Sequence, residues 1–224
     1  MKQEKDDNMP PPPSTFLVFG ATGGTGKHFI SMALQEGHRV KALVRNPAKL
    51  TVQHPNLQVQ QGSITDGGNL DDLVRGSDFV VAMVGDVALQ RDAKICTTFV
   101  KELIPAMRRH GVKRFLYQAG GLSRPYKESL PPLLWMIRYT LARGYAGQHT
   151  DNEAVIEYLV EDAQDIEWIV HRAGIGSDGP TKGTLKRSES NFSVATFRDC
   201  AAYNFRTLMD PSAVHTCNLS YYAE

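Results

Sequence analysis

The sequence has no apolar run that approaches the roughly 20 residues needed to cross a bilayer, so it offers no candidate transmembrane helix. Segment 1–14 also lacks the apolar core of a secretory signal peptide. Its polar residues and four prolines are typical of a disordered tail. We therefore expect a cytoplasmic protein with no membrane partner, whose single folded domain covers 15–224.

Cysteine is scarce, and the three that occur, Cys96, Cys200 and Cys217, are far apart and form no C-x-x-C pair. This pattern argues against disulfides and structural zinc, and it favours a reducing compartment. The seven histidines show no metal-ligand spacing either, so we expect no metal. A net charge of only +1 gives no reason to expect nucleic acid as a partner.

The most informative stretch is 15–45, where an apolar run is followed by glycines spaced G-x-x-G-x-x-G, a helical pattern and a second apolar run. This order predicts a β-α-β unit with its glycines at the strand-to-helix turn. Such glycines allow a sharp turn, close approach of a pyrophosphate and tight helix packing, and the helix N-terminus offers unpaired N–H groups to phosphates. The alternative is a tight turn without a ligand. The residues predicted to hold the phosphates are Gly20, Thr22, Gly23, Gly24, Thr25 and Gly26.

The heptapeptide GATGGTG at 20–26 resembles the glycine motif of the short-chain dehydrogenase/reductase superfamily, in its atypical and extended branches. Among these branches the chain is most similar to the NAD(P)H-binding NmrA-like and biliverdin reductase B (flavin reductase)-like proteins. The resemblance extends over roughly 15–220. It implies a Rossmann-type fold and a nicotinamide cofactor.

The end of the second predicted strand distinguishes NADPH from NADH. An acidic residue there would bind the ribose 2′-hydroxyl and repel a 2′-phosphate, but this sequence has Arg45. A guanidinium can pair with that phosphate, so we predict NADP as the cofactor, although Arg45 could also be an ordinary surface residue. The resemblance adds positions along the rest of the cofactor: Ser63, Val84, Gly85, Gln118 and Ala119.

Strand-like and helix-like segments alternate along the chain without internal repeats. This alternation predicts an α/β fold, a doubly wound and mostly parallel sheet with strand order 3-2-1-4-5-6 and room for a seventh strand. The patterns further predict a long helix over 87–110, a helix over 133–143, a helix capped by Thr150 or Asp151, and an irregular segment over 172–190.

Related reductases pair a serine or threonine on strand five with Tyr-x-x-x-Lys, and no Tyr-x-x-x-Lys occurs here. The nearest remnant is Tyr145 with His149 in the lysine's place, followed by Glu153. The serine position falls at Gln118 or Ala119. The candidate catalytic residues are therefore Tyr145, His149 and Gln118, with Ser123 from the loop after strand five. Tyr145 and His149 could equally be ordinary residues near a helix start.

Other candidates come from the second half of the chain. Ser123 and Tyr126 could face a substrate from the loop after strand five. An aromatic stripe could line an apolar pocket over the nicotinamide, or could belong to the core or an interface; it consists of Trp135, Met136 and Tyr139. A basic loop could bind an anion or simply be solvated; it contains Lys182, Lys186 and Arg187.

The function predicted first is hydride transfer from NADPH to a small carbonyl, enone or flavin-like substrate, which we expect to be apolar or aromatic. The first alternative is an NADP(H)-binding regulator or scaffold like the NmrA-like proteins. The second is a non-redox isomerase, dehydratase or cyclase that keeps the cofactor structurally. We expect a monomer or homodimer.

Overall fold

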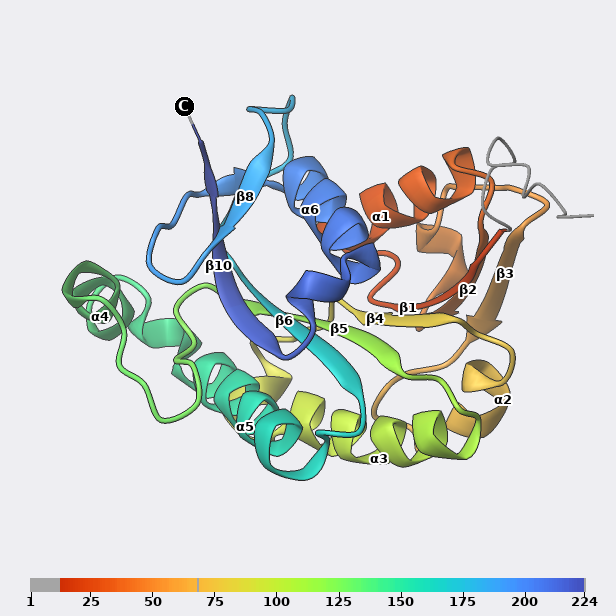
Figure 1. Cartoon of the computed structure of the whole chain (residues 1–224), viewed down its shortest axis with the longest axis horizontal. Coiled ribbons are helices and arrows are strands. Elements are labelled where there is room, and N and C mark those ends of the chain that lie inside the picture. Colours follow the sequence, from red (N-terminus) through yellow and green to blue (C-terminus); the bar gives the residue numbers. More distant parts are fainter. Residues whose placement is uncertain (1–12, 68, 224) are drawn as a thin grey trace, which may run out of the picture.

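The computed structural model describes residues 13–67 and 69–223. Its centre is an eight-stranded sheet with the order β3-β2-β1-β4-β5-β6-β10-β8 (Figure 1). All neighbouring strands run parallel except β8, which pairs antiparallel with β10. The predicted α/β class and strand order are confirmed, and the sheet gains two strands beyond the sixth.

The elements that form the two faces have the following bounds. The sheet comprises β1 (Thr15–Phe19), β2 (Arg39–Val44), β3 (Leu57–Gln61), β4 (Phe79–Ala82), β5 (Arg114–Gly120), β6 (Glu167–Ala173), β8 (Leu185–Ser188) and β10 (Thr216–Tyr222). A separate pair consists of β7 (Ile175–Ser177) and β9 (Ala195–Thr196). The helices are α1 (Gly24–Gln35), α2 (Leu70–Val74), α3 (Ile95–Arg109), α4 (Pro132–Tyr139), α5 (Ala146–Asp162) and α6 (Phe197–Met209).

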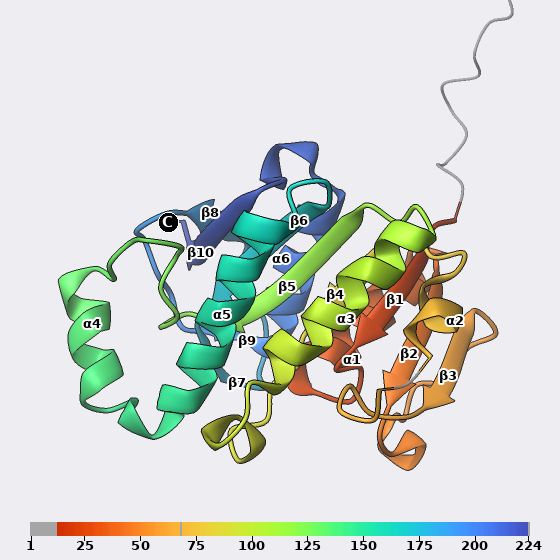
Figure 2. The same ribbon diagram turned by 90° about the horizontal axis from the view of Figure 1, so that it is seen from below.

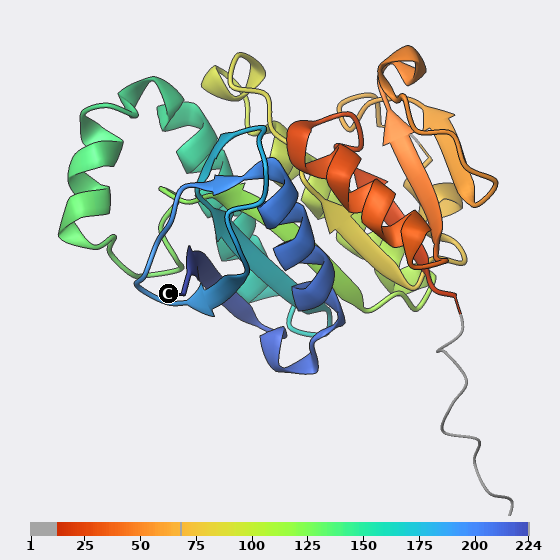
Figure 3. The same cartoon turned by 90° about the horizontal axis from the view of Figure 1, so that it is seen from above.

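Helices cover both faces of the sheet, α1 and α6 on one and α2, α3 and α5 on the other (Figures 1–3). The central strand β1 is buried along its whole length because its side chains alternate between two apolar layers. Phe16 belongs to the layer under α1 and α6, where it stacks on Phe79 at 5.0 Å between ring centroids. Leu17 and Phe19 belong to the layer under α3 and α5.

The helix predicted over 87–110 is shorter than the pattern suggested, because α3 begins only at Ile95. Its first turn is capped by another helix: the Asp151 carboxylate accepts hydrogen bonds from the backbone N–H groups of Cys96 and Thr97, each at 2.9 Å. Asp151 therefore does not cap its own helix, which begins at Ala146. The predicted cap was wrong because a carboxylate can satisfy the N–H groups of any helix end that packs beside it.

Two further segments differ from the sequence pattern. The stretch predicted to be irregular over 172–190 contains β7 and β8, since β8 pairs with the edge of β10. The disordered tail predicted for 1–14 falls mostly on 1–12, outside the described residues. Ser14 already belongs to the fold, since its backbone N–H donates to His38 Nδ1 at 3.1 Å.

Candidate functional site

A pocket of about 320 Å³ opens at the carboxyl ends of β1 and β4, where the strand order reverses. That position is the usual ligand site of open parallel sheets. Seven of the residues predicted to bind the cofactor line it: Gly20, Thr22, Gly23, Arg45, Ser63, Val84 and Gly85. The pocket is completed by Leu43, Val44, Lys49, Gly62, Ile64, Thr65, Met83, Asp86, Leu89 and Ile95.

The glycines of the first turn have different reasons for lacking a side chain. Gly20 has φ +85°, and a Cβ there would collide with the Met83 carbonyl. A Cβ on Gly26 would collide with the Gly20 carbonyl, so Gly26 permits close packing of helix and turn. Gly23 is the N-cap of α1 without a side-chain cap, and a Cβ there would meet only the Gly20 oxygen at 3.2 Å. The turn therefore places no side chain of Gly20 or Gly23 between the pocket and the N-terminus of α1, a cradle that fits a pyrophosphate.

Gly24 and Thr25 lie behind this turn and do not line the pocket. A Cβ on Gly24 would meet the Phe197 ring at 2.6 Å, so this glycine lets α6 pack against α1. Thr25 is buried at 4% exposure. Both residues pack behind the turn, on the side away from the pocket. Their direct contact with a cofactor stays a prediction.

Arg45 and Asp86 face each other across the pocket. Arg45 Nη1 lies 3.3 Å from Asp86 Oδ2, with the arginine side chain 68% and the aspartate side chain 28% exposed. The hydrogen bond from the Leu89 N–H lowers the pKa of the Asp86 carboxyl, and Arg45 lowers it further. Lys49 adds a second cation to the pocket lining. The site thus holds two cations, one of them paired with an anchored carboxylate.

Gly85 marks the boundary between the pocket and α5. A Cβ on Gly85 would lie 2.9 Å from the Gln148 amide nitrogen, so a larger residue there would displace the end of this side chain. Ser63 lies at the opposite end of the pocket, where its hydroxyl is 2.9 Å from that of Thr65. A ribose or adenine could replace that hydrogen bond.

Gln118 occupies a buried chain of polar groups under the glycine turn. Its Oε1 accepts from Asn204 Nδ2 at 2.7 Å, and Asn204 Oδ1 lies 2.6 Å from His171 Nδ1. Its amide nitrogen donates to the Thr25 hydroxyl at 3.5 Å. Ala119 is buried beside it. These hydrogen bonds make Gln118 of β5 a link to α6 and to the start of α1.

Tyr145 and His149 are not brought together as an acid and its charged helper. Tyr145 is 48% exposed, and its hydroxyl makes no hydrogen bond to a described residue. His149 is 4% exposed, and neither ring nitrogen has a partner among the described residues. Burial, aided by the charge of Arg138, lowers the pKa of His149 to about 4. The imidazole is therefore neutral at pH 7, and a catalytic role for the pair stays a prediction.

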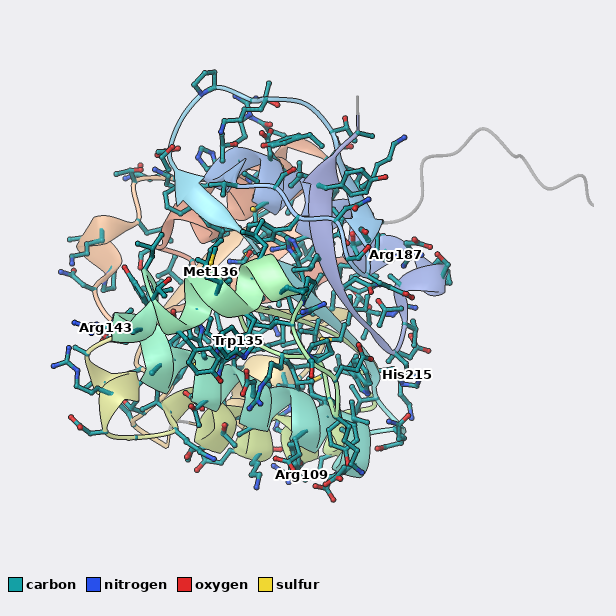
Figure 4. The ribbon with its side chains drawn as sticks, turned by 90° about the vertical axis from the view of Figure 1, so that its left-hand side faces the viewer. Arg109, Trp135, Met136, Arg143, Arg187 and His215 are labelled. Carbon is teal, nitrogen blue, oxygen red and sulfur yellow. The ribbon has the colours of Figure 1, made fainter. Side chains whose placement is uncertain are left out.

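Ser123 is fully buried, its hydroxyl accepting from Asn152 Nδ2 at 3.3 Å. Trp135, Met136 and Tyr139 of α4 are each more than half exposed, and none of them lines the described pocket. Figure 4 labels Trp135 and Met136 on this helix. The stripe is therefore not part of the core, and its place over the nicotinamide stays a prediction. The basic residues Lys182, Lys186 and Arg187 are exposed and also lie outside the described pocket.

Asp86 is the acidic residue of the pocket, and the sequence analysis missed it. An acid directly after Gly85, the glycine that follows the fourth strand, was the available signal. Within the described ranges no group of three His, Cys, Asp or Glu side chains is arranged to hold a metal ion. Over the same ranges, no helix has the length and apolar character to span a membrane.

Comparison with protein families places the chain. Residues 20–210 match the model of a family described as NAD(P)H-binding. A 3β-hydroxysteroid dehydrogenase/Δ5→4-isomerase of Mycobacterium tuberculosis is 33% identical over 112 residues, 45% of this chain and 30% of that enzyme. Averufin oxidase A of Aspergillus flavus is 24% identical over 217 residues, 84% of this chain and 75% of that protein. The chain thus spans about a third of the steroid enzyme that it matches.

Solved structures share the fold. The anaerobillin reductase ChuY of Escherichia coli O157:H7 superposes with a TM-score of 0.73 at 18% identity, covering 92% of this chain and 96% of ChuY. A short-chain dehydrogenase/reductase of Veillonella parvula gives 0.70 at 15% identity, with 93% and 94% covered. At these identities the likeness concerns the fold.

Proposed function

The chain belongs to the NAD(P)H-binding family whose model it matches, and from that premise we propose that it is an NADPH-dependent reductase of small, apolar or aromatic substrates. The observation that carries this proposal is the pocket at the ends of β1 and β4, which combines an uncapped helix N-terminus with Arg45 and Lys49. The relatives reported above bear names of oxidoreductases.

The selection of NADPH follows from charge. The pyrophosphate would lie against Gly23 at the N-terminus of α1, whose first turn has no side-chain cap. A 2′-phosphate on the adenosine ribose would then meet Arg45 and Lys49 at the end of β2. Arg45 would exchange the Asp86 carboxylate for the doubly charged phosphate, which offers more acceptor oxygens.

When bound, the nicotinamide supplies a hydride for reduction of a carbonyl, an enone or a flavin-like ring. The protein holds and orients it, and a neutral His149 cannot lower the pKa of a tyrosine acid by its charge. We therefore propose that the proton comes from solvent or from Tyr145, which is 48% exposed just before α5.

The test is stopped-flow oxidation of NADPH by purified protein with flavins, quinones and enones. Arg45→Met serves as a matched variant, because it keeps the length of the side chain and removes the charge. The proposal expects saturable NADPH oxidation that weakens in the variant through KM. An absence of oxidation with all three substrate classes contradicts it.

A regulatory NADP(H)-binding protein is the second candidate, and the neutral, buried His149 beside an exposed Tyr145 favours it. Such a protein would bind NADP⁺ and NADPH without turnover. Calorimetry with both forms, combined with a pull-down in each, distinguishes the two functions. Tight binding without oxidation, with a partner captured in only one redox form, supports regulation.

A further inference from the structure

A second pocket lies on the face of the sheet that carries α5, between that helix and β10. It is lined by none of the residues that line the cofactor pocket, and its volume is about 510 Å³. His215, on the side of the molecule that faces the viewer in Figure 4, marks its rim. We call it the α5–β10 pocket.

Two buried hydrogen-bond donors that line this pocket have no acceptor among the described residues: Trp168 Nε1 and Arg172 Nε. The tryptophan is 4% and the arginine 2% exposed. Buried donors are normally paired, since an unpaired one costs about 1–3 kcal/mol and a charged one more. Their position at the pocket wall indicates that the acceptors come from outside the described residues.

Leaving Arg172 without an acceptor costs more free energy than leaving Trp168 without one, because the guanidinium is charged. Its one hydrogen bond to a described residue runs from Nη1 to the Ser123 carbonyl at 3.2 Å, and no described carboxylate lies within 4.0 Å of it. Burial lowers the pKa of the Arg172 guanidinium, and the Cys217 side chain and the negative charge of Glu128 offset that shift only in part. The acids on the rim, Glu128 and Glu189, are both exposed.

The floor between the two donors is apolar. Trp168 and Arg172 lie four residues apart on β6 and therefore on the same face, with Cα atoms about 13 Å apart. Between them β10 contributes Cys217, opposite Val170. Burial raises the pKa of the Cys217 thiol to about 11, so it is neutral there. Val160 of α5 forms part of the opposite wall.

We propose that the α5–β10 pocket binds a small, elongated carboxylate with an apolar middle, whose anionic end pairs with Arg172 and whose other end accepts a hydrogen bond from the Trp168 indole. The site is separate from the cofactor pocket, so its occupancy does not depend on the proposed reductase function.

The chain has two tryptophans, so Trp135→Phe leaves Trp168 as the single indole reporter. This variant, labelled with ¹⁵N at the indole, is titrated by NMR with 3-(4-hydroxyphenyl)propionate and with the corresponding amide. The proposal expects a saturable downfield shift of the Trp168 N–H resonance with the acid. It expects binding at least about tenfold weaker for the amide, which lacks the charge that Arg172 pairs with.

Three further variants in the Trp135→Phe background locate the site. Arg172→Gln should abolish saturable binding of the acid. Val160→Phe should also abolish it by filling the wall, and it leaves Arg172 intact if Arg172→Gln fails to fold. Glu128→Gln should tighten binding a few-fold by removing a nearby negative charge.

One contrary result is a Trp168 N–H resonance that stays in place up to about 20 mM acid, a concentration beyond any useful dissociation constant. That result means that water alone satisfies the two donors, and it overturns the proposal. Equal affinity for acid and amide overturns it as well. A Glu128→Gln protein that binds no more tightly and unfolds several degrees lower shows that Glu128 is the partner of Arg172, which also overturns it.

Discussion

Replacing Asp86 by asparagine should strengthen NADPH binding and leave NADH binding nearly unchanged. In the described structure Asp86 holds Arg45 by an ion pair of 3.3 Å across the cofactor pocket. A 2′-phosphate must displace that carboxylate and then remain beside it. Asparagine keeps an Oδ1 that can accept the Leu89 N–H, so the loop after β4 keeps its anchor.

The size of the effect follows from exposure. Arg45 is 68% and Asp86 28% exposed, so their pair is worth about 0.2–1 kcal/mol, as for other exposed ion pairs. Removing the repulsion between the carboxylate and a bound phosphate adds a similar amount. Together these terms amount to about 0.5–2 kcal/mol, or roughly a two- to thirtyfold gain in NADPH affinity.

Calorimetry with NADPH and NADH at about 50 and 500 mM salt measures this gain. It should shrink at the higher salt, because both interactions are exposed to screening. The control is the double variant Arg45→Met with Asp86→Asn, compared with Arg45→Met alone. Its NADPH affinity should rise only by the amount that removing the repulsion between Asp86 and the phosphate contributes. An equal gain for both cofactors, or a loss for NADPH, refutes the assignment of Arg45 to the phosphate.

Three further predictions concern α5. Asp151→Ala should lower the free energy of unfolding by about 2–4 kcal/mol in guanidinium titrations, since buried N–H groups at the start of α3 lose their acceptor. The control Asp162→Ala, at an exposed position, should change the free energy of unfolding by no more than about 0.5 kcal/mol. His149 has a folded pKa of about 4 against 6.5 unfolded, so its neutral burial favours folding fully above pH 6.5 and this contribution is lost as pH falls toward 4. His149→Leu should therefore make unfolding less sensitive to pH over that range, and an unchanged pH dependence contradicts the assignment. Tyr145→Phe should change turnover by no more than a few-fold, and a loss of about 10²–10⁴ would identify Tyr145 as the proton donor after all.

The β-α-β unit was predictable because its determinants are local. The apolar run of β1, the glycines and Arg45 follow one another within 15–45, and each position is set by strand geometry or a turn. The same holds for the order of the parallel strands, since right-handed crossovers leave few alternatives. Seven residues chosen from sequence consequently line one pocket.

The contacts that could not be predicted join residues far apart in the chain. Asp151 caps α3 from 54 and 55 residues away, and Asp86 pairs with Arg45 from 41 residues away. The aromatic stripe of α4 has a clear period, but the period alone does not say whether a neighbouring element covers it, and Trp135 is 54% exposed. Such outcomes depend on packing, for which a single sequence carries no direct signal.

The central claim is that the pocket at the ends of β1 and β4 binds NADP(H) and that Arg45 reads the 2′-phosphate. Titration of wild-type protein and Arg45→Asp with NADP⁺ and NAD⁺ tests it most directly. The substitution removes a charge-assisted pair and adds repulsion, so NADP⁺ affinity should fall on the order of a hundredfold while NAD⁺ affinity stays within a few-fold. Equal losses for the two cofactors would contradict the claim.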